Sequence, residues 1–379
     1  GIENTGVGSS ALDANTTGNY NTAVGQGSLD NNTTASNNTA VGHDSLKANT
    51  TGDQNTVVGS TAMDANTTGQ DNTAMGYGAL GANTTGSYNV GIGFGSLEAN
   101  TSASLNVAVG YNALEANTTG ASNVAIGKDA LATNSSASNN VAVGKQALLA
   151  NTTGGSNVAI GTSTLAANTT ASDNTGVGYA VLLVNTTGTN NTGVGVNALQ
   201  ANTTASDNTA VGRNALLSNT DGHSNTALGS QAGDSITTGD ENTVVGHGAL
   251  DGATTVSGNT AVGTDTMGST SYAGSYNTAV GYNAMLVATT ADGITAVGNQ
   301  CLDALTTGYG ALRDQTGGEE NTALGYLAGH NVTTGSGNVA VGQEALGAAS
   351  GNFNVAIGRE SLNDCTAADN VAVGKAALD

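Results

Sequence analysis

The chain has no proline and no tryptophan, and its 379 residues include only ten tyrosines and two phenylalanines. Because large aromatic side chains supply much of a normal core, this composition excludes an ordinary globular domain. Charged residues make up 9% of the chain, compared with roughly 25% in typical soluble domains. The surface must therefore consist mostly of neutral Asn, Thr, Ser and Gly.

Basic residues are especially few: Lys and Arg total 7, whereas Asp and Glu total 28, which gives a net charge of −21. A surface with so few cations cannot neutralise phosphates, so anionic membranes are poor partners and we expect no nucleic acid partner. No stretch approaches the roughly 20 apolar residues of a membrane span, so we expect none in this chain. No signal peptide is visible and the chain begins at Gly1, so we expect a mature product or a fragment.

Cysteine is also scarce, with only Cys301 and Cys365. In a solenoid whose rungs add about 4.8 Å each, these residues would lie roughly 14–19 Å apart. A disulfide requires Cα atoms within about 7 Å, so we predict two unpaired thiols.

What the chain has instead is a repeat of 17 residues. The glycine that closes the motif N-[TV]-[AGV]-[VIML]-G recurs at this spacing from Gly8 to Gly263, in 16 copies, and then less evenly to Gly374, which makes 22 copies. We expect one continuous array over 1–379, regular over 1–263, irregular over 264–325 and regular again over 326–379. A short period with strand-like apolar residues is typical of a solenoid.

The rung around Gly127 shows how each copy alternates. Val124 and Ile126 fall on one face of a strand, and Ala125 falls on the other. We predict that the larger first and third strand residues point inward, and that the small middle residues form an outer face for close packing. Leu or Met follows four residues after the glycine in 20 of 22 copies and is also predicted to be buried. The predicted core therefore includes Val24, Leu29, Val41, Leu46, Ile126 and Leu131.

Two copies lack this leucine and hold Gly233 or Gly329 instead, with Ile236 or Val332 three residues later. This compensation predicts that both positions reach the same core. The sequence thus predicts an all-β fold, a parallel β-solenoid of about 22 rungs with two short strands per rung joined by tight turns. A helix is disfavoured because 17 residues cannot hold a strand, a useful helix and two turns.

An asparagine seven residues after the glycine begins an N-x-[ST] sequon in many copies. Two interpretations are open, a glycan acceptor on each rung or an internal ladder of stacked amides. Later copies hold Ile236, Ala253 or Val332 there, which is not expected of a solvent-facing glycan site, so the ladder is favoured. Its predicted members are Asn15, Asn32, Asn49, Asn66, Asn83, Asn100, Asn117, Asn134, Asn151, Asn168, Asn185 and Asn202.

Two further columns follow from the repeat. An asparagine four residues before the glycine occurs in 21 of 22 copies, with Ile294 as the exception, and is predicted to form a second ladder or a turn cap. The pair Thr16–Thr17 and its equivalents form a threonine column. Such a column either organises water, as in ice binding, or simply suits a solvated β-surface.

Six aromatic residues directly follow the repeat glycine and are candidate surface contacts along one corner: Tyr77, Phe94, Tyr111, Tyr179, Tyr282 and Tyr326. The four histidines are scattered in unlike positions, so neither a metal site nor a catalytic base is indicated. The glycine-rich segments lack a phosphate-binding spacing, and no nucleophile, base and oxyanion donor come together. We therefore expect no enzyme, no metal and no cofactor.

These motifs resemble a known family. Asn-Val-Ala-Ile-Gly at 123–127 and Asn-Val-Ala-Val-Gly at 106–110 are similar to the head repeat of trimeric autotransporter adhesins, the YadA-like heads. Similar arrays are also typical of bacteriophage tail-fibre-like proteins. The resemblance implies a left-handed parallel β-roll whose chains associate three side by side. The adhesin repeat is usually shorter, so the turns of this chain must be longer.

We therefore expect an extracellular or cell-surface structural and adhesive fibre. It would self-associate as a homotrimer or filament and contact a host surface or a glycan receptor. The alternatives are the shaft of a phage tail fibre on a virion, and an ice- or glycan-binding solenoid. The spacing breaks most within 264–320, where Tyr309–Leu312 resembles a truncated rung. We expect a bulge or protruding loop there, and a specialised contact patch.

Overall fold

The computed structural model describes residues 1–269, 272–286, 292–293, 295–299, 320–348 and 351–378. These residues form an all-β structure without a helix. Among them there is accordingly no helix that is long and apolar enough to span a membrane. The strands are β1 (Thr5–Val7), β2 (Thr22–Val24), β3 (Thr39–Val41), β4 (Thr56–Val58), β5 (Thr73–Met75), β6 (Val90–Ile92), β7 (Val107–Val109), β8 (Val124–Ile126), β9 (Val141–Val143), β10 (Val158–Ile160), β11 (Thr175–Val177), β12 (Thr192–Val194), β13 (Thr209–Val211), β14 (Thr226–Leu228), β15 (Thr243–Val245), β16 (Thr260–Val262), β17 (Thr278–Val280), β18 (Thr295–Val297), β19 (Thr322–Leu324), β20 (Val339–Val341), β21 (Val355–Ile357) and β22 (Val371–Val373).

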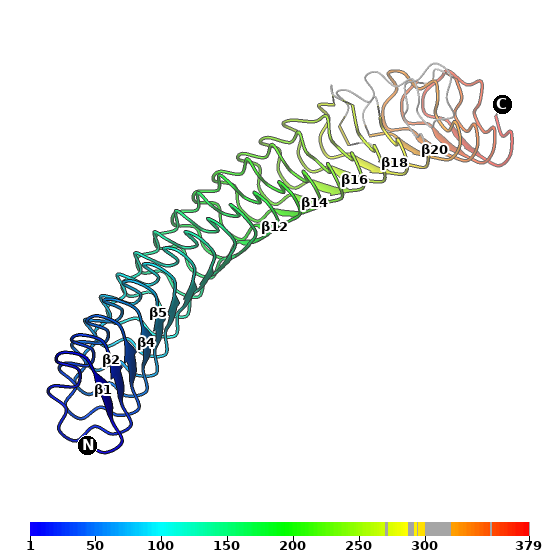
Figure 1. The fold of residues 1–379 in the computed structure, drawn as a ribbon. Helices are drawn as coiled ribbons and strands as arrows, with labels where there is room; N and C mark the ends of the chain where they lie inside the picture. The colour runs from blue at the N-terminus through cyan, green and yellow to red at the C-terminus, as the bar shows by residue number, and fades with distance from the viewer. Residues whose placement is uncertain (270–271, 287–291, 294, 300–319, 349–350, 379) are drawn as a thin grey trace. The chain divides into compact units, whose positions relative to one another are not determined.

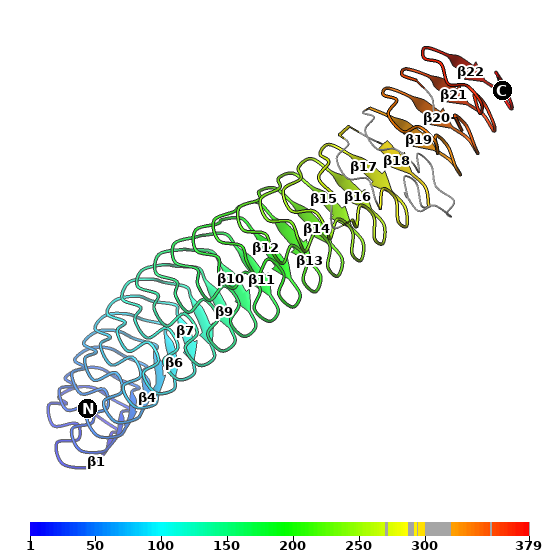
Figure 2. The same ribbon diagram turned by 90° about the horizontal axis from the view of Figure 1, so that it is seen from above.

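The predicted parallel β-solenoid is confirmed. Its 22 strands belong to one parallel sheet that grows by one strand per rung (Figures 1 and 2). By compactness the chain divides into two units, Gly1–Asn190 and Asn191–Asp379. Within each unit successive strands pair in register, as Thr22 pairs with Thr39. The backbone N–H of Thr22 donates to Asn38 O at 2.8 Å, which is typical of the bonds that join consecutive rungs.

Each described rung has one strand, so the prediction of two strands per rung is wrong. The opposite side is also bonded from rung to rung, because the N–H of Leu29 donates to Ser45 O at 3.1 Å. However, its backbone is not extended: Leu29 has a φ of 49°, and Leu46 and Leu131 have similar values. This left-handed conformation costs roughly 1–2 kcal/mol per residue. It turns the leucine side chain into the interior, where burial offsets the cost.

The prediction of which strand face is buried is also wrong. Val24 is 36% exposed, Ile126 is 39% exposed and Val41 is half-buried, whereas the middle residue of every strand after β1, such as Ala125, is buried. The interior is narrow and already holds one leucine per rung. A Cβ added to Gly91, a middle strand residue, would lie 3.3 Å from Leu80 Cγ. Only Ala, Gly or an occasional Val fits opposite the leucine column, so the larger residues point outward.

The leucine column fills the core as predicted. Leu29, Leu46 and Leu131 are fully buried, as is the whole column from Leu29 to Leu216. In the terminal rungs Leu12 is half-buried and Leu378 is exposed. In the rung that lacks the leucine, a Cβ on Gly233 would lie 2.9 Å from Ile236 Cδ1 and 3.2 Å from Leu216 Cδ2. Ile236 therefore occupies the space of the missing leucine, and Val332 is likewise fully buried.

The first asparagine column lies in the same interior and bonds from rung to rung. Asn117 Nδ2 donates to Asn100 Oδ1 at 3.1 Å, and Asn134 Nδ2 donates to Asn117 Oδ1 at 2.9 Å. Among the predicted ladder residues, Asn15 in the first rung is partly exposed and the others are fully buried: Asn32, Asn49, Asn66, Asn83, Asn100, Asn117, Asn134, Asn151, Asn168, Asn185 and Asn202. A buried amide leaves no room for a glycan in the folded chain, so the ladder interpretation holds for these residues.

The second asparagine column forms another ladder beside the first. Asn38 Oδ1 accepts the backbone N–H of Asn55 at 2.9 Å and its side-chain amide at 3.1 Å. Asn38 Nδ2 donates to Gly52 O at 2.9 Å, and the same carbonyl accepts from Asn49 of the first column at 2.9 Å. Where both columns hold asparagine, as at Asn38 and Asn49, they therefore meet at one carbonyl of the turn and pair with polar groups that the narrow core buries. Ile294, the exception in this column, lies outside the described residues.

The first ladder ends at Asn219. Its Nδ2 donates to Asn202 Oδ1 at 3.1 Å, but its own Oδ1 is buried without a hydrogen-bond partner. The reason is that the next rung holds Ile236 at the ladder position, which has no donor. Beyond this point the interior of the described rungs depends on apolar contacts at that position, as at Ala253 and Val332.

The leucine column predicts a sharp difference between two adjacent leucines. Leu148 is fully buried and Leu149 is half-buried. We expect Leu148→Ala to lower the local free energy of unfolding by about 2–5 kcal/mol because it opens a cavity. Leu149→Ala should cost less than about 1 kcal/mol. Native-state hydrogen exchange of the rungs around residue 148 measures both, and equal losses of protection would contradict the assignment of the core.

The asparagine ladder predicts a second difference. Asn117→Val keeps the side chain close in size but leaves Asn100 Oδ1 buried without its donor, which costs about 1–3 kcal/mol. Thr119→Ala, at an exposed position of the same turn, should change little. Hydrogen exchange of residues 100–134 is the measurement. Unchanged protection in Asn117→Val would show that the ladder does not stabilise the stack.

Candidate functional site

The outward face of the sheet is an uncharged, largely aliphatic stripe. The first and third residues of the strands form it, and they are only Thr or Val followed by Val, Ile, Leu or Met. Its third-position side chains are well exposed in many rungs, as at Met75, Ile160 and Leu228. We call this surface the sheet face. The sequence assigned these side chains to the core, so their availability at the surface follows from the structure alone.

The longest run of the sheet face without threonine lies over β6–β10. In these five strands both outward positions are aliphatic, from Val90 and Ile92 in β6 to Val158 and Ile160 in β10. In β2–β5 the first outward position is threonine instead, as in Thr22 and Thr39. Parallel sheets normally have both faces covered by other parts of the protein. An exposed aliphatic face on a parallel sheet is therefore unusual.

A second candidate surface is the corner that follows the repeat glycine. Tyr77 stacks on Phe94 with ring centroids 5.3 Å apart and planes 13° apart, and Phe94 stacks on Tyr111 at 5.3 Å and 10°. Lys128 continues the column in the next rung, with Nζ 5.5 Å from the centroid of the Tyr111 ring. Of the predicted surface contacts, the structure thus brings three together: Tyr77, Phe94 and Tyr111. The other three are exposed at the same corner of other rungs: Tyr179, Tyr282 and Tyr326.

The same corner carries most of the positive charge. Five of the seven Lys and Arg residues directly follow a repeat glycine: Lys128, Lys145, Arg213, Arg359 and Lys375. His43 and His247 hold this position too, so the expectation that all four histidines occupy unlike positions is wrong. The clustering of basic residues at this position can be read from the sequence, but only when the copies of the repeat are aligned on their glycine.

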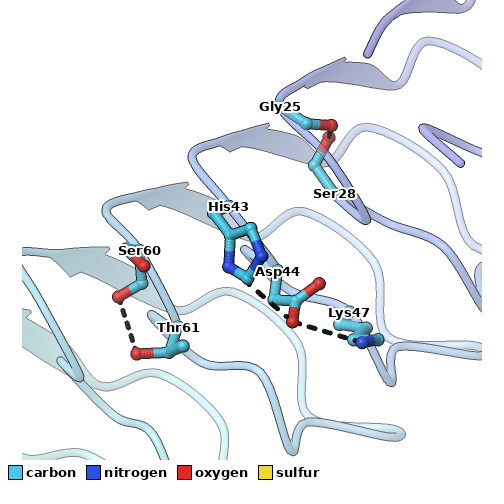
Figure 3. A network of polar contacts seen from close by, with 7 residues as sticks. All are labelled: Gly25, Ser28, His43, Asp44, Lys47, Ser60 and Thr61. Carbon is cyan, nitrogen blue, oxygen red and sulfur yellow. Dashed lines mark hydrogen bonds and ion pairs between the residues drawn. The ribbon is translucent and has the colours of Figure 1, made fainter. Parts of the chain in front are cut away.

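Two of the corner side chains, His43 and Lys128, have a carboxylate beside them in their own rung. Asp44 Oδ2 lies 3.2 Å from Lys47 Nζ and 3.8 Å from His43 Nδ1 (Figure 3). Lys128 Nζ similarly lies 3.8 Å from Asp129 Oδ2. Exposed ion pairs of this kind contribute at most about 1 kcal/mol. Their effect is to keep the corner from becoming a continuous positive ridge.

The threonine column contributes hydrogen bonds between consecutive rungs. Thr16 Oγ1 donates to Thr33 O at 2.8 Å, and Thr33 Oγ1 donates to Thr50 O at 3.1 Å. The first threonine of each such pair therefore helps to join the rungs. The second one, as at Thr34 and Thr51, is exposed.

One concave feature lies beside the aromatic corner. A hollow of about 430 Å³ opens at Tyr77 and Gly78 and is bordered by Asp64 and Glu98. Partial burial raises the pKa of Asp64, and the Asp44 carboxylate raises it further. Sequence reasoning missed this hollow because no motif marks it. The sequence does mark the place by two glycines of one rung, Gly78 and Gly81. In most other copies of the repeat, larger residues hold these two positions.

The sheet continues through the irregular region as far as it is described. Thr260 pairs with Thr278 across an 18-residue step, and Thr295 pairs with Thr322 across a 27-residue step. Within the 18-residue rung, Tyr272 is buried: its hydroxyl donates to Asn259 Oδ1 at 3.3 Å and accepts from Asn277 Nδ2 at 2.6 Å.

Burial raises the pKa of Tyr272 above its ordinary value. The truncated rung at Tyr309–Leu312, the loop expected there and Cys301 lie outside the described residues. Cys365 is a free thiol.

The described ranges contain no group of three or more His, Cys, Asp or Glu side chains arranged to hold a metal ion. The resemblance to adhesin heads and tail-fibre arrays stays a prediction from the repeat. No protein-family model, no curated protein and no solved structure matches this chain.

Proposed function

We propose that this chain is a structural and adhesive fibre that works outside the cell, and that its copies associate side by side through the sheet face. The observation that carries the proposal is the exposed, uncharged stripe of aliphatic side chains along the strands, including Ile126 and Ile160. An extended apolar patch on a soluble chain marks an interaction surface. No catalytic role is part of this proposal.

Electrostatics favour a second copy of the chain as the partner on this face. The chain carries a net charge of −21, so most of its surfaces repel one another when two copies approach. The sheet face is the exception, because none of its outward positions is charged. Two copies can therefore approach there without bringing like charges together.

The repeat also provides complementarity. Ridges on the sheet face recur with each strand, about 4.8 Å apart, and a second copy has the same spacing. One copy's side chains can thus fit between those of another over many rungs. The Val/Ile pairs of β6–β10 would form the driest part of such an interface.

The available area is sufficient for a stable interface. Eleven strands, each about 10 Å long and 4.8 Å from the next, present roughly 500 Å² of face in each unit. The two units together therefore offer roughly 1,000 Å², and stable interfaces need about 800 Å² per partner. Self-association through this face accounts for a parallel sheet that the single chain leaves uncovered.

The resemblance to adhesin heads suggests three chains per fibre. Such a fibre would display the corner and turn positions many times along its length, so that weak contacts with a host surface add up through multivalency. The shaft of a phage tail fibre would use the same architecture to hold a receptor-binding tip away from the particle.

Ice binding is a weaker alternative on the same face. Threonine and valine columns lie side by side in β2–β4, but β6–β10 interrupt the threonine column with valine. The Thr16-type hydroxyls are already used in bonds to the next rung. A wild-type chain that stays monomeric and depresses the freezing point of water would favour this alternative.

The double variant Ile126→Lys/Ile160→Lys tests self-association. The two lysines would lie two rungs apart in one column, and burying each charge in an interface costs several kcal/mol. We expect the wild type to form oligomers and the double variant to dissociate at least 100-fold more readily. Sedimentation velocity and native mass spectrometry measure this and count the chains.

The matched control is Thr162→Lys. Thr162 is an exposed corner residue, and Lys128 and Lys145 already occupy the same position in preceding rungs. This control should keep the wild-type oligomer, and circular dichroism should show folded protein in both variants. A monomeric wild type, or a double variant that oligomerises normally, would overturn the proposal.

A further inference from the structure

The hollow beside Tyr77 owes its existence to two glycines. Four glycines occupy the second position after the repeat glycine, and a Cβ on three of them would meet a side chain of the following rung: Gly27, Gly95 and Gly248. A Cβ on Gly27 would lie 2.2 Å from Asp44 Oδ1, for example, so that carboxylate covers the glycine. A Cβ on Gly78 would meet nothing within 4 Å, because the following rung holds Gly95 there.

A second gap widens the hollow. Asp64, Gly81 and Glu98 occupy equivalent positions in three consecutive rungs, so the middle rung lacks the side chain that its neighbours carry. The result is a recess of about 430 Å³ with a carboxylate on either side. This volume falls in the range of small-molecule sites, roughly 300–1,000 Å³.

Tyr77 provides an aromatic wall. It is 57% exposed, and one side of its ring is covered by Phe94. On the other side the corner position of the preceding rung holds Ser60, whose carbonyl accepts a hydrogen bond from Thr61 Oγ1 at 2.8 Å (Figure 3). Because serine is small, no ring covers Tyr77 from that side. Tyr77 and Thr61 both line the hollow.

We infer that this hollow binds one sugar residue of a non-acidic glycan. A pyranose has an apolar face of C–H groups that can cover the electron-rich face of Tyr77. Its hydroxyl or amino groups can donate to the carboxylates of Asp64 and Glu98, and charge-assisted bonds of this type are strong. The same two carboxylates repel sialic or uronic acids.

The site is independent of the proposed self-association. Its residues belong to the corner and the adjoining turn of β4–β6 rungs, and not to the outward strand positions of the sheet face. Sugar binding should therefore persist in Ile126→Lys/Ile160→Lys, so failure of one proposal can be told apart from failure of the other.

The test uses the full chain with N,N′,N″-triacetylchitotriose and maltotriose as neutral probes and 3′-sialyllactose as the acidic one. Saturation-transfer NMR detects contact, and calorimetry gives affinity. We expect at least one neutral probe to bind, with 3′-sialyllactose at least tenfold weaker. Gly81→Glu should lower the affinity at least tenfold, because it fills the gap with the residue that Glu98 and Glu115 place at the same position.

Two further variants make the result specific. Tyr77→Ser copies Ser60 at the same corner position and should also lower the affinity at least tenfold. Ala166→Glu adds the same charge to the same column five rungs away and should leave binding unchanged. The inference is overturned if neither neutral probe binds the wild type, if Gly81→Glu binds as well as Ala166→Glu, or if the sialylated probe binds best.

Discussion

Hydrogen bonds that run from each rung to the next are the interaction on which this structure depends. A rung of 17 residues buries little more than one leucine, a few alanines and two asparagines, which is far too little to fold alone. Stacking supplies what a single rung lacks. The strand, the left-handed turn at Leu29 and the amides of Asn38 and Asn49 all bond to neighbouring rungs. Stability therefore belongs to the array and grows with each added repeat.

The narrow interior explains how the chain can do without aromatic residues and proline. An amide that bonds to its equivalents above and below leaves no unpaired polar group, so asparagine can fill a core that is too thin for large side chains. The unpaired Oδ1 of Asn219 shows what happens where a column stops. The same thinness selects alanine, glycine or an occasional valine at the inward strand position and leaves the larger residues of each strand, such as isoleucine, on the outside.

This inversion connects the fold to its proposed role. Because the aliphatic residues do not fit inside, the chain presents an apolar sheet face that a second copy can cover. The corner works differently, since its side chains are not constrained by packing and vary from rung to rung. Aromatic, basic and small residues there create local differences on a uniform scaffold, such as the Tyr77–Phe94–Tyr111 stack and the hollow next to it.

The sequence alone determined the period, the parallel stacking, the leucine and asparagine columns and the replacement of Leu by Ile236, because each is a regularity between copies. It could not decide which face of the strand is buried. The alternation of Val124, Ala125 and Ile126 is compatible with either face of the strand being buried. Ala125 is the buried residue because the space next to Leu131 is too small for a larger side chain. The hollow at Gly78 was also beyond reach, because it arises from side chains missing in adjacent rungs. The tertiary structure decided these points, since available volume depends on neighbours that lie about 17 residues away in the sequence.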